Sequence, residues 1–172
     1  ATATNNVFQV IDSTLGLPAT LAPSLADGRI PFYTSINTTI APRYRINGFY
    51  NNTTTAIPIY LPGEIMLIKA EAMARTNNLT GALAELNKVI TKTATADLFK
   101  VGAGLTASTA STSSEILEEI YKNRCIELYM SGLKLEDMRR FGRPVTERKR
   151  NFFPYPFRER DGNPNTPTDP SF

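Results

Sequence analysis

The sequence predicts a mainly α protein, formed by a helical hairpin plus further helices with long irregular loops. Apolar residues recur at helical spacing over residues 63–76 and again from about Leu79 to Lys92, with an Asn-rich break between the two stretches. Thr112 and Glu115 have the spacing of a capping box, which indicates the start of a third helix. Three helices predicted between residues 63 and 132 therefore set the fold class.

The first helix, over residues 63–76, follows Pro62, a residue that is favoured at a helix start. Its polar residues form one narrow stripe of Glu64, Glu71 and Arg75. A helix that is apolar on nearly every side is typical of a buried position, so we expect this helix to be covered by other elements. Glu71 and Arg75 are spaced for an i,i+4 ion pair.

The second helix has a tight apolar stripe of Leu79, Leu83, Leu86 and Ile90. The following Gly/Ala/Ser/Thr-rich residues 101–113 predict a flexible loop. The third helix is expected to end at Gly132 in a left-handed cap, and a short helix from about Leu133 to Phe141 should be closed by Gly142.

Two charged residues interrupt the apolar face of the third helix, with Arg124 in its middle and Glu127 at its edge. A buried charge has to be paired, because an unpaired one costs several kcal/mol. We interpret these residues as part of a structural ion-pair network, although an arginine-tuned catalytic carboxylate is the alternative. The predicted network comprises Glu71, Arg75, Arg124, Glu127, Asp137 and Arg140.

Three segments differ in composition. Residues 1–60 predict an irregular segment with short β-like runs over residues 7–11 and 57–61 and nothing long enough for a helix. Residues 61–142 form the helical region, and residues 143–172 predict a Pro-rich C-terminal coil.

Composition excludes several kinds of site. The chain has no His, so Ser/His/Asp and Cys/His triads and His-ligated metal sites are excluded. Its one cysteine, Cys125, allows neither an internal disulfide nor a Cys-based zinc cluster, and we expect it to be a small buried apolar residue. No metal and no cofactor are therefore predicted.

Two further motifs are better explained by structure than by function. The carboxylate pairs Glu64 with Glu71 and Glu118 with Glu119 could serve glycoside hydrolysis, but acidic residues near a helix start have a structural reason to be there. The basic, aromatic stretch of residues 139–160 could bind single-stranded nucleic acid, but its prolines favour a chain laid along a surface. We therefore expect no enzyme and no nucleic-acid partner.

Four runs resemble one family of proteins. Residues 61–75 read LPGEIMLIKAEAMAR and resemble R-x-x-E-x-x-L-I-x-A-E-A, and residues 82–89 read ALAELNKV and resemble A-x-x-x-L-N-x-V-R. Residues 116–128 read ILEEIYKNRCIEL and resemble I-L-x-E-I-x-x-E-R-x-x-E-L, with Asn123 where Glu is usual. Residues 132–142 read GLKLEDMRRFG and are similar to G-x-R-W-x-D-L-R-R-x-G.

These motifs resemble the SusD/RagB family, and shorter echoes at residues 41–43, 153–156 and 163–165 extend the resemblance over about residues 41–165. The resemblance implies the C-terminal portion of a larger SusD-like α-helical domain that contains tetratricopeptide-like helix pairs. It implies a cell-surface, lipid-anchored protein of the bacterial outer membrane, attached through a lipidated N-terminus absent from this chain. Neither a membrane-spanning stretch nor a signal peptide is found in the sequence, which indicates a processed or partial chain.

The function implied by the resemblance is non-catalytic capture of a glycan or other nutrient and its delivery to a SusC-like TonB-dependent transporter. From the residues themselves, Arg43, Tyr44 and Tyr50 are the candidate ligand-binding side chains, because they belong to an Arg/Tyr/Asn-rich loop. The alternative function is a tetratricopeptide-like scaffold that binds a protein partner, although stacked repeats need about three units for stability.

Overall fold

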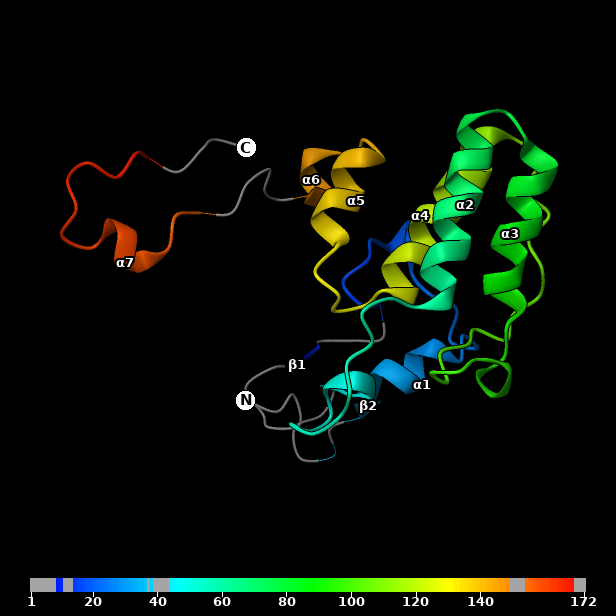
Figure 1. The fold of residues 1–172 in the computed structure, drawn as a ribbon, viewed down its shortest axis with the longest axis horizontal. Coiled ribbons are helices and arrows are strands. Elements are labelled where there is room, and N and C mark those ends of the chain that lie inside the picture. Colours follow the sequence, from blue (N-terminus) through cyan, green and yellow to red (C-terminus); the bar gives the residue numbers. More distant parts are fainter. Residues whose placement is uncertain (1–8, 11–13, 37, 39–43, 149–153, 169–172) are drawn as a thin grey trace. The chain divides into compact units, whose positions relative to one another are not determined.

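The computed structural model describes residues 9–10, 14–36, 38, 44–148 and 154–168, and it confirms the mainly α fold class (Figure 1). Arg43 and the aromatic residues Phe152 and Phe153 lie outside the described residues. The chain divides into two compact units, residues 1–131 and residues 132–172.

The predicted helical hairpin is confirmed in the first unit. Helix α2 (Pro62–Arg75) and helix α3 (Leu79–Thr91) lie side by side, and both contact helix α4 (Ser113–Glu127) (Figure 1). The reversal between α2 and α3 uses Asn77 in the left-handed region, with φ of 63°. Asn78 then caps α3, since its side chain accepts a hydrogen bond from the backbone N–H of Gly81.

The expectation that α2 is buried nearly all round is wrong. Ile65 and Ile68 are 52% and 48% exposed, although Leu67, Ala70 and Ala74 on the other side are buried. The sequence showed that several sides of α2 are apolar, but α3 and α4, the described helices that pack against it, cover only part of its circumference.

Helix α4 begins as predicted and ends earlier than predicted. The capping box is confirmed, because Thr112 accepts the N–H of Glu115 and the Glu115 carboxylate accepts the N–H of Thr112. The helix stops at Glu127 rather than near Gly132. The first left-handed residue after it is Met130, with φ of 65°, and so the chain turns two residues before the glycine.

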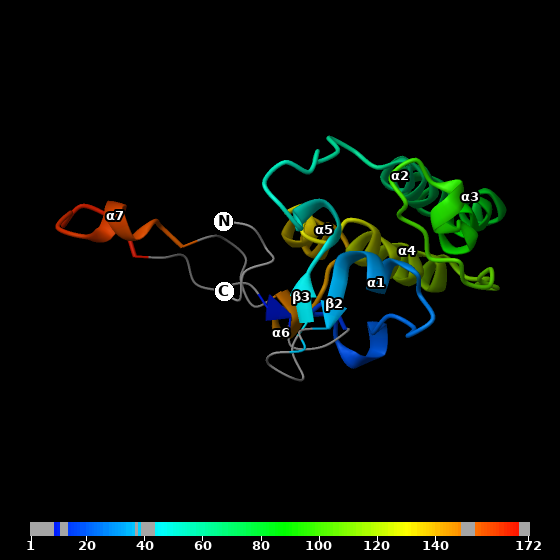
Figure 2. The ribbon, with the colours of Figure 1, turned by 90° about the horizontal axis from the view of Figure 1, so that it is seen from below.

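Residues 1–60 contain more regular structure than predicted. Strands β1 (Gln9–Val10), β3 (Tyr44–Ile46) and β2 (Thr34–Ile36) pair antiparallel in that order, with Val10 and Ile36 both opposite Tyr44. A five-residue helix, α1 (Arg29–Tyr33), runs directly into β2 (Figure 2), and short 3₁₀-helices form at η1 (Ala19–Leu21) and η2 (Gly48–Tyr50). The expectation that no helix forms here is therefore wrong.

The β-like run over residues 57–61 forms no strand, because Pro58 has no N–H to donate and no described strand lies beside the run. Residues 101–113 are an ordered coil rather than the predicted flexible loop. They follow 3₁₀-helix η3 (Ala94–Ala96), and Val101 and Ala103 are buried. Backbone hydrogen bonds from Gly104 to Lys92 and from Leu105 to Ile90 tie this coil to the end of α3.

An apolar cluster joins four segments of the first unit. Tyr33, Leu61, Val101 and Leu128 are its buried members, and Phe32, Phe49, Phe99 and Tyr129 pack against it. The rings meet edge to face, for example Phe32 with Tyr33 at a centroid distance of 4.9 Å. This cluster fixes α1 against the residues that precede α2 and follow α4, and thereby holds the buried charges described below.

The second unit contains helix α5 (Lys134–Arg140) and two helical turns, α6 (Val145–Arg148) and α7 (Phe157–Arg160). The predicted end of α5 is confirmed, since Gly142 has φ of 61° and the N–H of Arg143 reaches back to Met138. The expectation of a coil after residue 143 is wrong at α6 and α7. Among the helices that the structure describes, none is long and apolar enough to cross a membrane.

Candidate functional site

Glu127 lies at the centre of a buried network of charges in the first unit. Its carboxylate is fully buried and pairs with two cations, Arg29 at 3.2 Å and Lys92 at 2.7 Å. Arg29 also holds Asp27 at 2.7 Å, and Lys92 also holds Asp97 at 2.7 Å. Each cation therefore bridges two carboxylates, which is how charges with so little exposure are tolerated.

Backbone groups complete the network. The carboxylate of Asp97 accepts the N–H groups of Phe99 and Val101 at 2.8 and 3.2 Å, and that of Asp27 accepts the N–H of Arg29 at 3.0 Å. Burial by itself lowers the pKa of Arg29, but the hydrogen bond and charge of Asp27 and the charge of Glu127 raise it overall. Arg29 is therefore a fixed cation, not a proton donor.

The start of α2 lies directly against Glu127. A Cβ added at Gly63 would lie 2.0 Å from Oε1 of Glu127 and 2.6 Å from its carboxyl carbon, so the helix backbone approaches the carboxylate as closely as a glycine allows. The positive end of the helix dipole favours a negative charge at this point. The network holds three carboxylates and two cations, and the end of α2 offsets part of that imbalance.

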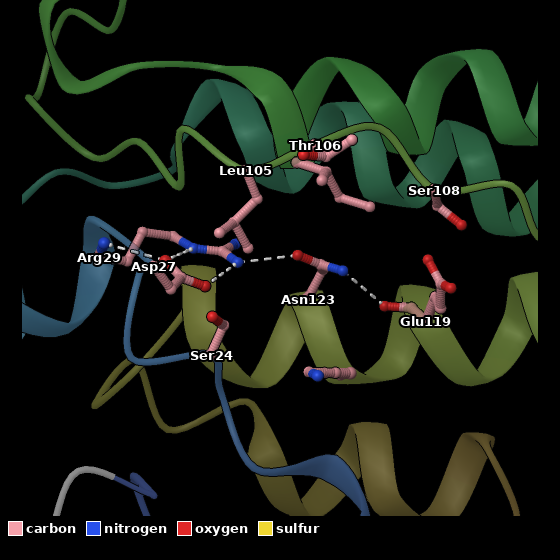
Figure 3. Close-up of a pocket in the computed structure, with 10 residues that line it drawn as sticks. Ser24, Asp27, Arg29, Leu105, Thr106, Ser108, Glu119 and Asn123 are labelled. Carbon is pink, nitrogen blue, oxygen red and sulfur yellow. Dashed lines mark hydrogen bonds and ion pairs between the residues drawn. The ribbon is translucent and has the colours of Figure 1, made fainter.

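The network continues to a cavity beside α4. Nη2 of Arg29 donates to Oδ1 of Asn123 at 2.8 Å, and Nδ2 of Asn123 donates to the carbonyl oxygen of Glu119 at 2.9 Å (Figure 3). The cavity measures about 220 Å³. It is lined by Ser24, Asp27, Arg29, Ile90, Leu105, Thr106, Ser108, Glu119, Lys122 and Asn123.

One wall of this cavity is fastened by Asn87 of α3. Its side-chain amide accepts the N–H of Ser108 at 2.7 Å and donates to the carbonyl oxygen of Ser108 at 3.1 Å. Figure 3 shows the Ser108 hydroxyl and the Glu119 carboxylate facing one another across the space between this wall and α4. The cavity thus has two walls, each held by hydrogen bonds that are at least partly buried.

Two of the three predicted ligand-binding residues lie in the part of the chain that the structure describes. Arg43 lies outside the described residues, and Tyr44 lies half-buried in β3. Tyr50 ends η2 and donates its hydroxyl to the carbonyl oxygen of Met130 at 3.1 Å, and burial raises its pKa. The hydroxyl of Tyr50 thus has a structural partner, and the ligand-binding role of these residues stays a prediction.

Members of the predicted ion-pair network lie in both units. Glu71 pairs with Arg75 at 2.9 Å in the first unit, and Asp137 pairs with Arg140 at 2.7 Å in the second. The structure gives Glu127 two partners that were not predicted, Arg29 and Lys92. Arg124 is 3% exposed, and its place in a network stays a prediction.

Five residues of this site were not predicted from the sequence: Asp27, Arg29, Lys92, Asp97 and Asn123. Arg29 and Glu127 are 98 positions apart, so no local pattern connects them. One signal was present at Asn123, which stands where the resembling motif carries Glu. A neutral amide at this position accepts from Arg29 without adding a further negative charge to the network.

No group of three or more His, Cys, Asp or Glu side chains that could hold a metal ion occurs in the part of the chain that the structure describes. Cys125 is buried, as expected. The charged groups of the network satisfy one another and favour a structural role, while the cavity beside α4 offers hydrogen-bonding groups to a ligand.

Comparison with known proteins identifies the class. The family model of the SusD family matches residues 29–169, which is most of the chain, and the chain therefore belongs to this family. The match begins at Arg29, one of the two cations that pair with Glu127. Membership in this family supports a nutrient- or glycan-binding role, and proteins of the family are generally non-catalytic. A search of curated proteins found no match to the chain.

Proposed function

We propose that this chain takes part in the non-catalytic capture of a glycan or related nutrient at the surface of the bacterial outer membrane. Membership in the SusD family over residues 29–169 is the observation that carries this proposal. The protein would be held at the membrane through a lipidated N-terminus and would pass its ligand to a SusC-like TonB-dependent transporter.

The charge network supports a structural rather than a catalytic role for its three carboxylates. A catalytic carboxylate has to reach a substrate, whereas the carboxylates of Asp27, Asp97 and Glu127 are each at most 5% exposed and each pair with a cation. Their position explains stability of the fold and leaves ligand binding to more exposed groups.

Arg43, Tyr44 and Tyr50 are proposed to contact the ligand. Sugars stack their C–H faces on aromatic rings, and Tyr44 and Tyr50 are each only half-buried. Tyr50 allows a sharp test: Tyr50→Phe removes the hydroxyl that holds Met130 but keeps the ring, whereas Tyr50→Ala removes both. Binding that survives Phe and is lost with Ala would support stacking, and binding that survives both would refute it.

The function itself is tested by affinity gel electrophoresis of the full-length protein against a panel of polysaccharides. We expect retardation by one glycan whose chain length does not change on incubation. Shortening of the polymer would contradict the non-catalytic part of the proposal. Retardation by no glycan would refute glycan capture.

A second candidate function is a helical scaffold that binds a protein partner. The exposed apolar residues Ile65 and Ile68 on the outer face of α2 favour it, because such a face is available for a further helix. Copurification of a protein partner that is lost with Ile65→Asp and Ile68→Asp, together with no binding to any glycan, would favour the scaffold.

A further inference from the structure

The cavity beside α4 presents polar groups that the fold does not use. Among the described residues, no hydrogen bond or ion pair engages the carboxylate of Glu119, the ammonium of Lys122 or the hydroxyl of Thr106. Glu119 and Lys122 are one helical turn apart on α4, and both are half-buried. Unused donors and acceptors that converge on one cavity are what a polar ligand completes.

The size of the cavity limits the ligand. At about 220 Å³ the cavity is smaller than the roughly 300–1,000 Å³ of sites for drug-sized molecules. This volume suits one ring of sugar size and excludes an extended oligosaccharide from lying fully inside.

The chemistry of the lining matches neighbouring hydroxyl groups. Glu119 can only accept and Lys122 can only donate, whereas Thr106 and Ser108 carry hydroxyls that can do both. Each hydroxyl of a sugar both donates and accepts, so adjacent hydroxyls can satisfy the carboxylate and the ammonium together. Ile90 and Leu105 supply apolar surface for the C–H groups of a ring.

An uncharged ligand is favoured over a charged one. The charges of Glu119 and Lys122 cancel, so the pair attracts neither anions nor cations as a whole. Both side chains are half-exposed, and ion pairs in such places gain little, whereas hydrogen bonds from neutral hydroxyls to charged groups are stronger than those between neutral groups.

The walls are organised before a ligand arrives. Asn87 holds the backbone of Ser108 through two hydrogen bonds, and Asn123 is held between Arg29 and the carbonyl oxygen of Glu119. Fixed walls reduce the ordering that binding would otherwise require.

We infer that this cavity binds one uncharged sugar residue, either a free monosaccharide or the end of a glycan chain, between Glu119, Lys122 and Ser108. The inference rests on the proposed function for the class of ligand, and the site is separate from Tyr44 and Tyr50.

Saturation-transfer NMR on the full-length protein, with glucose, galactose and mannose as probes, tests the inference. We expect transfer to at least one sugar, and Glu119→Gln should weaken its binding about tenfold or more, because the charged acceptor is lost. Lys122→Met is a second variant with the same expected direction. Glu118→Gln is the matched control, since Glu118 is exposed on the same helix and does not line the cavity. Unchanged melting temperatures would establish that the variants fold.

Several results would overturn the inference: no transfer to any sugar, equal affinities for the wild type and Glu119→Gln, or preferred binding of a free amino acid. Affinity electrophoresis on a polysaccharide separates the two proposals. Equal retardation of the wild type and Glu119→Gln, together with equal affinities of the two proteins for the monosaccharides, would refute the cavity site and leave glycan capture standing. Binding of no glycan and no sugar would refute both proposals. Weaker retardation of Glu119→Gln would show that the cavity takes a glycan end, and a defect confined to monosaccharides would show that it takes the free sugar.

Discussion

The carboxylate of Glu127 lies where a side chain at Gly63 would begin. A Cβ at Gly63 would come within 2.0 Å of Oε1 of Glu127, and the same oxygen is 2.7 Å from Nζ of Lys92. The backbone at the start of α2 thus contacts a buried, paired carboxylate at the end of α4. Any residue larger than glycine at position 63 has to displace that charge.

Gly63→Ala should therefore destabilise the protein, although alanine is the better helix former by about 1 kcal/mol. We expect a net loss of about 2 kcal/mol or more in the free energy of unfolding, because the Glu127 carboxylate would move away from Lys92. Denaturant unfolding measures it. Gly81→Ala is the control, since the three atoms nearest a Cβ there belong to the side chains of exposed Asn78 and half-buried Met73, at 2.8–2.9 Å, and not to a buried ion pair. A larger loss for Gly81→Ala would contradict the argument.

Lys92 and Lys69 form a matched pair for testing burial. Each lysine contacts a carboxylate at 2.7 Å, but the side chain of Lys92 is 9% exposed and that of Lys69 is 54% exposed. Lys92→Met leaves Asp97 without a cation and should cost about 3–5 kcal/mol, whereas Lys69→Met should cost less than about 1 kcal/mol. Equal losses in denaturant unfolding would show that the buried network does not stabilise the fold.

The helices of the first unit could be predicted because their signals are local. The stripe from Leu79 to Ile90 and the capping box of Thr112 and Glu115 depend on residues a few positions apart. Helix α1 could not be predicted in this way, since it has five residues and includes Pro31. Its contacts are distant: Arg29 donates to Glu127, and the hydroxyl of Tyr33 donates to the carbonyl oxygen of Glu127 at 2.6 Å.

The site was predictable in part for the same reason. Glu127 stood out as a charge at the edge of an apolar helix face, which indicates burial and pairing. Its partners Arg29 and Lys92 lie 98 and 35 positions away, and no spacing rule selects them. The cavity depends on Asn87 holding Ser108, a contact between a helix and a low-complexity coil that composition alone assigns to a flexible loop.

Asn87→Ala should release the coil that contains Ser108. Two hydrogen bonds from the amide are lost and the backbone groups of Ser108 are left unpaired, so we expect a loss of about 1–3 kcal/mol in stability. Hydrogen exchange should speed up at the amide of Ser108. Thr91→Ala on the same helix is the control, since its exposed hydroxyl bonds only to the Asn87 carbonyl oxygen, and it should change stability by less than about 0.5 kcal/mol. Unchanged exchange at Ser108 in Asn87→Ala would refute the role of this clamp.

The lowered pKa of Glu85 predicts how the stability of the protein depends on pH. Hydrogen bonds from Lys69 at 2.7 Å and Lys88 at 2.8 Å lower the pKa of Glu85 below its ordinary value of 4.5. A carboxylate with a lowered pKa stabilises the folded state fully above the unfolded pKa, because both states are then ionised. As the pH falls below about 4.5, the unfolded chain binds the proton first, and the contribution is lost by the time the folded pKa is passed.

Glu85→Gln should therefore lower stability at pH 7 and flatten its decline below pH 4.5, and Lys69→Met should flatten it less, since Lys88 remains. Unfolding curves at a series of pH values measure both slopes, and a decline in Glu85→Gln as steep as in the wild type would rule out this ion pair as a source of acid sensitivity.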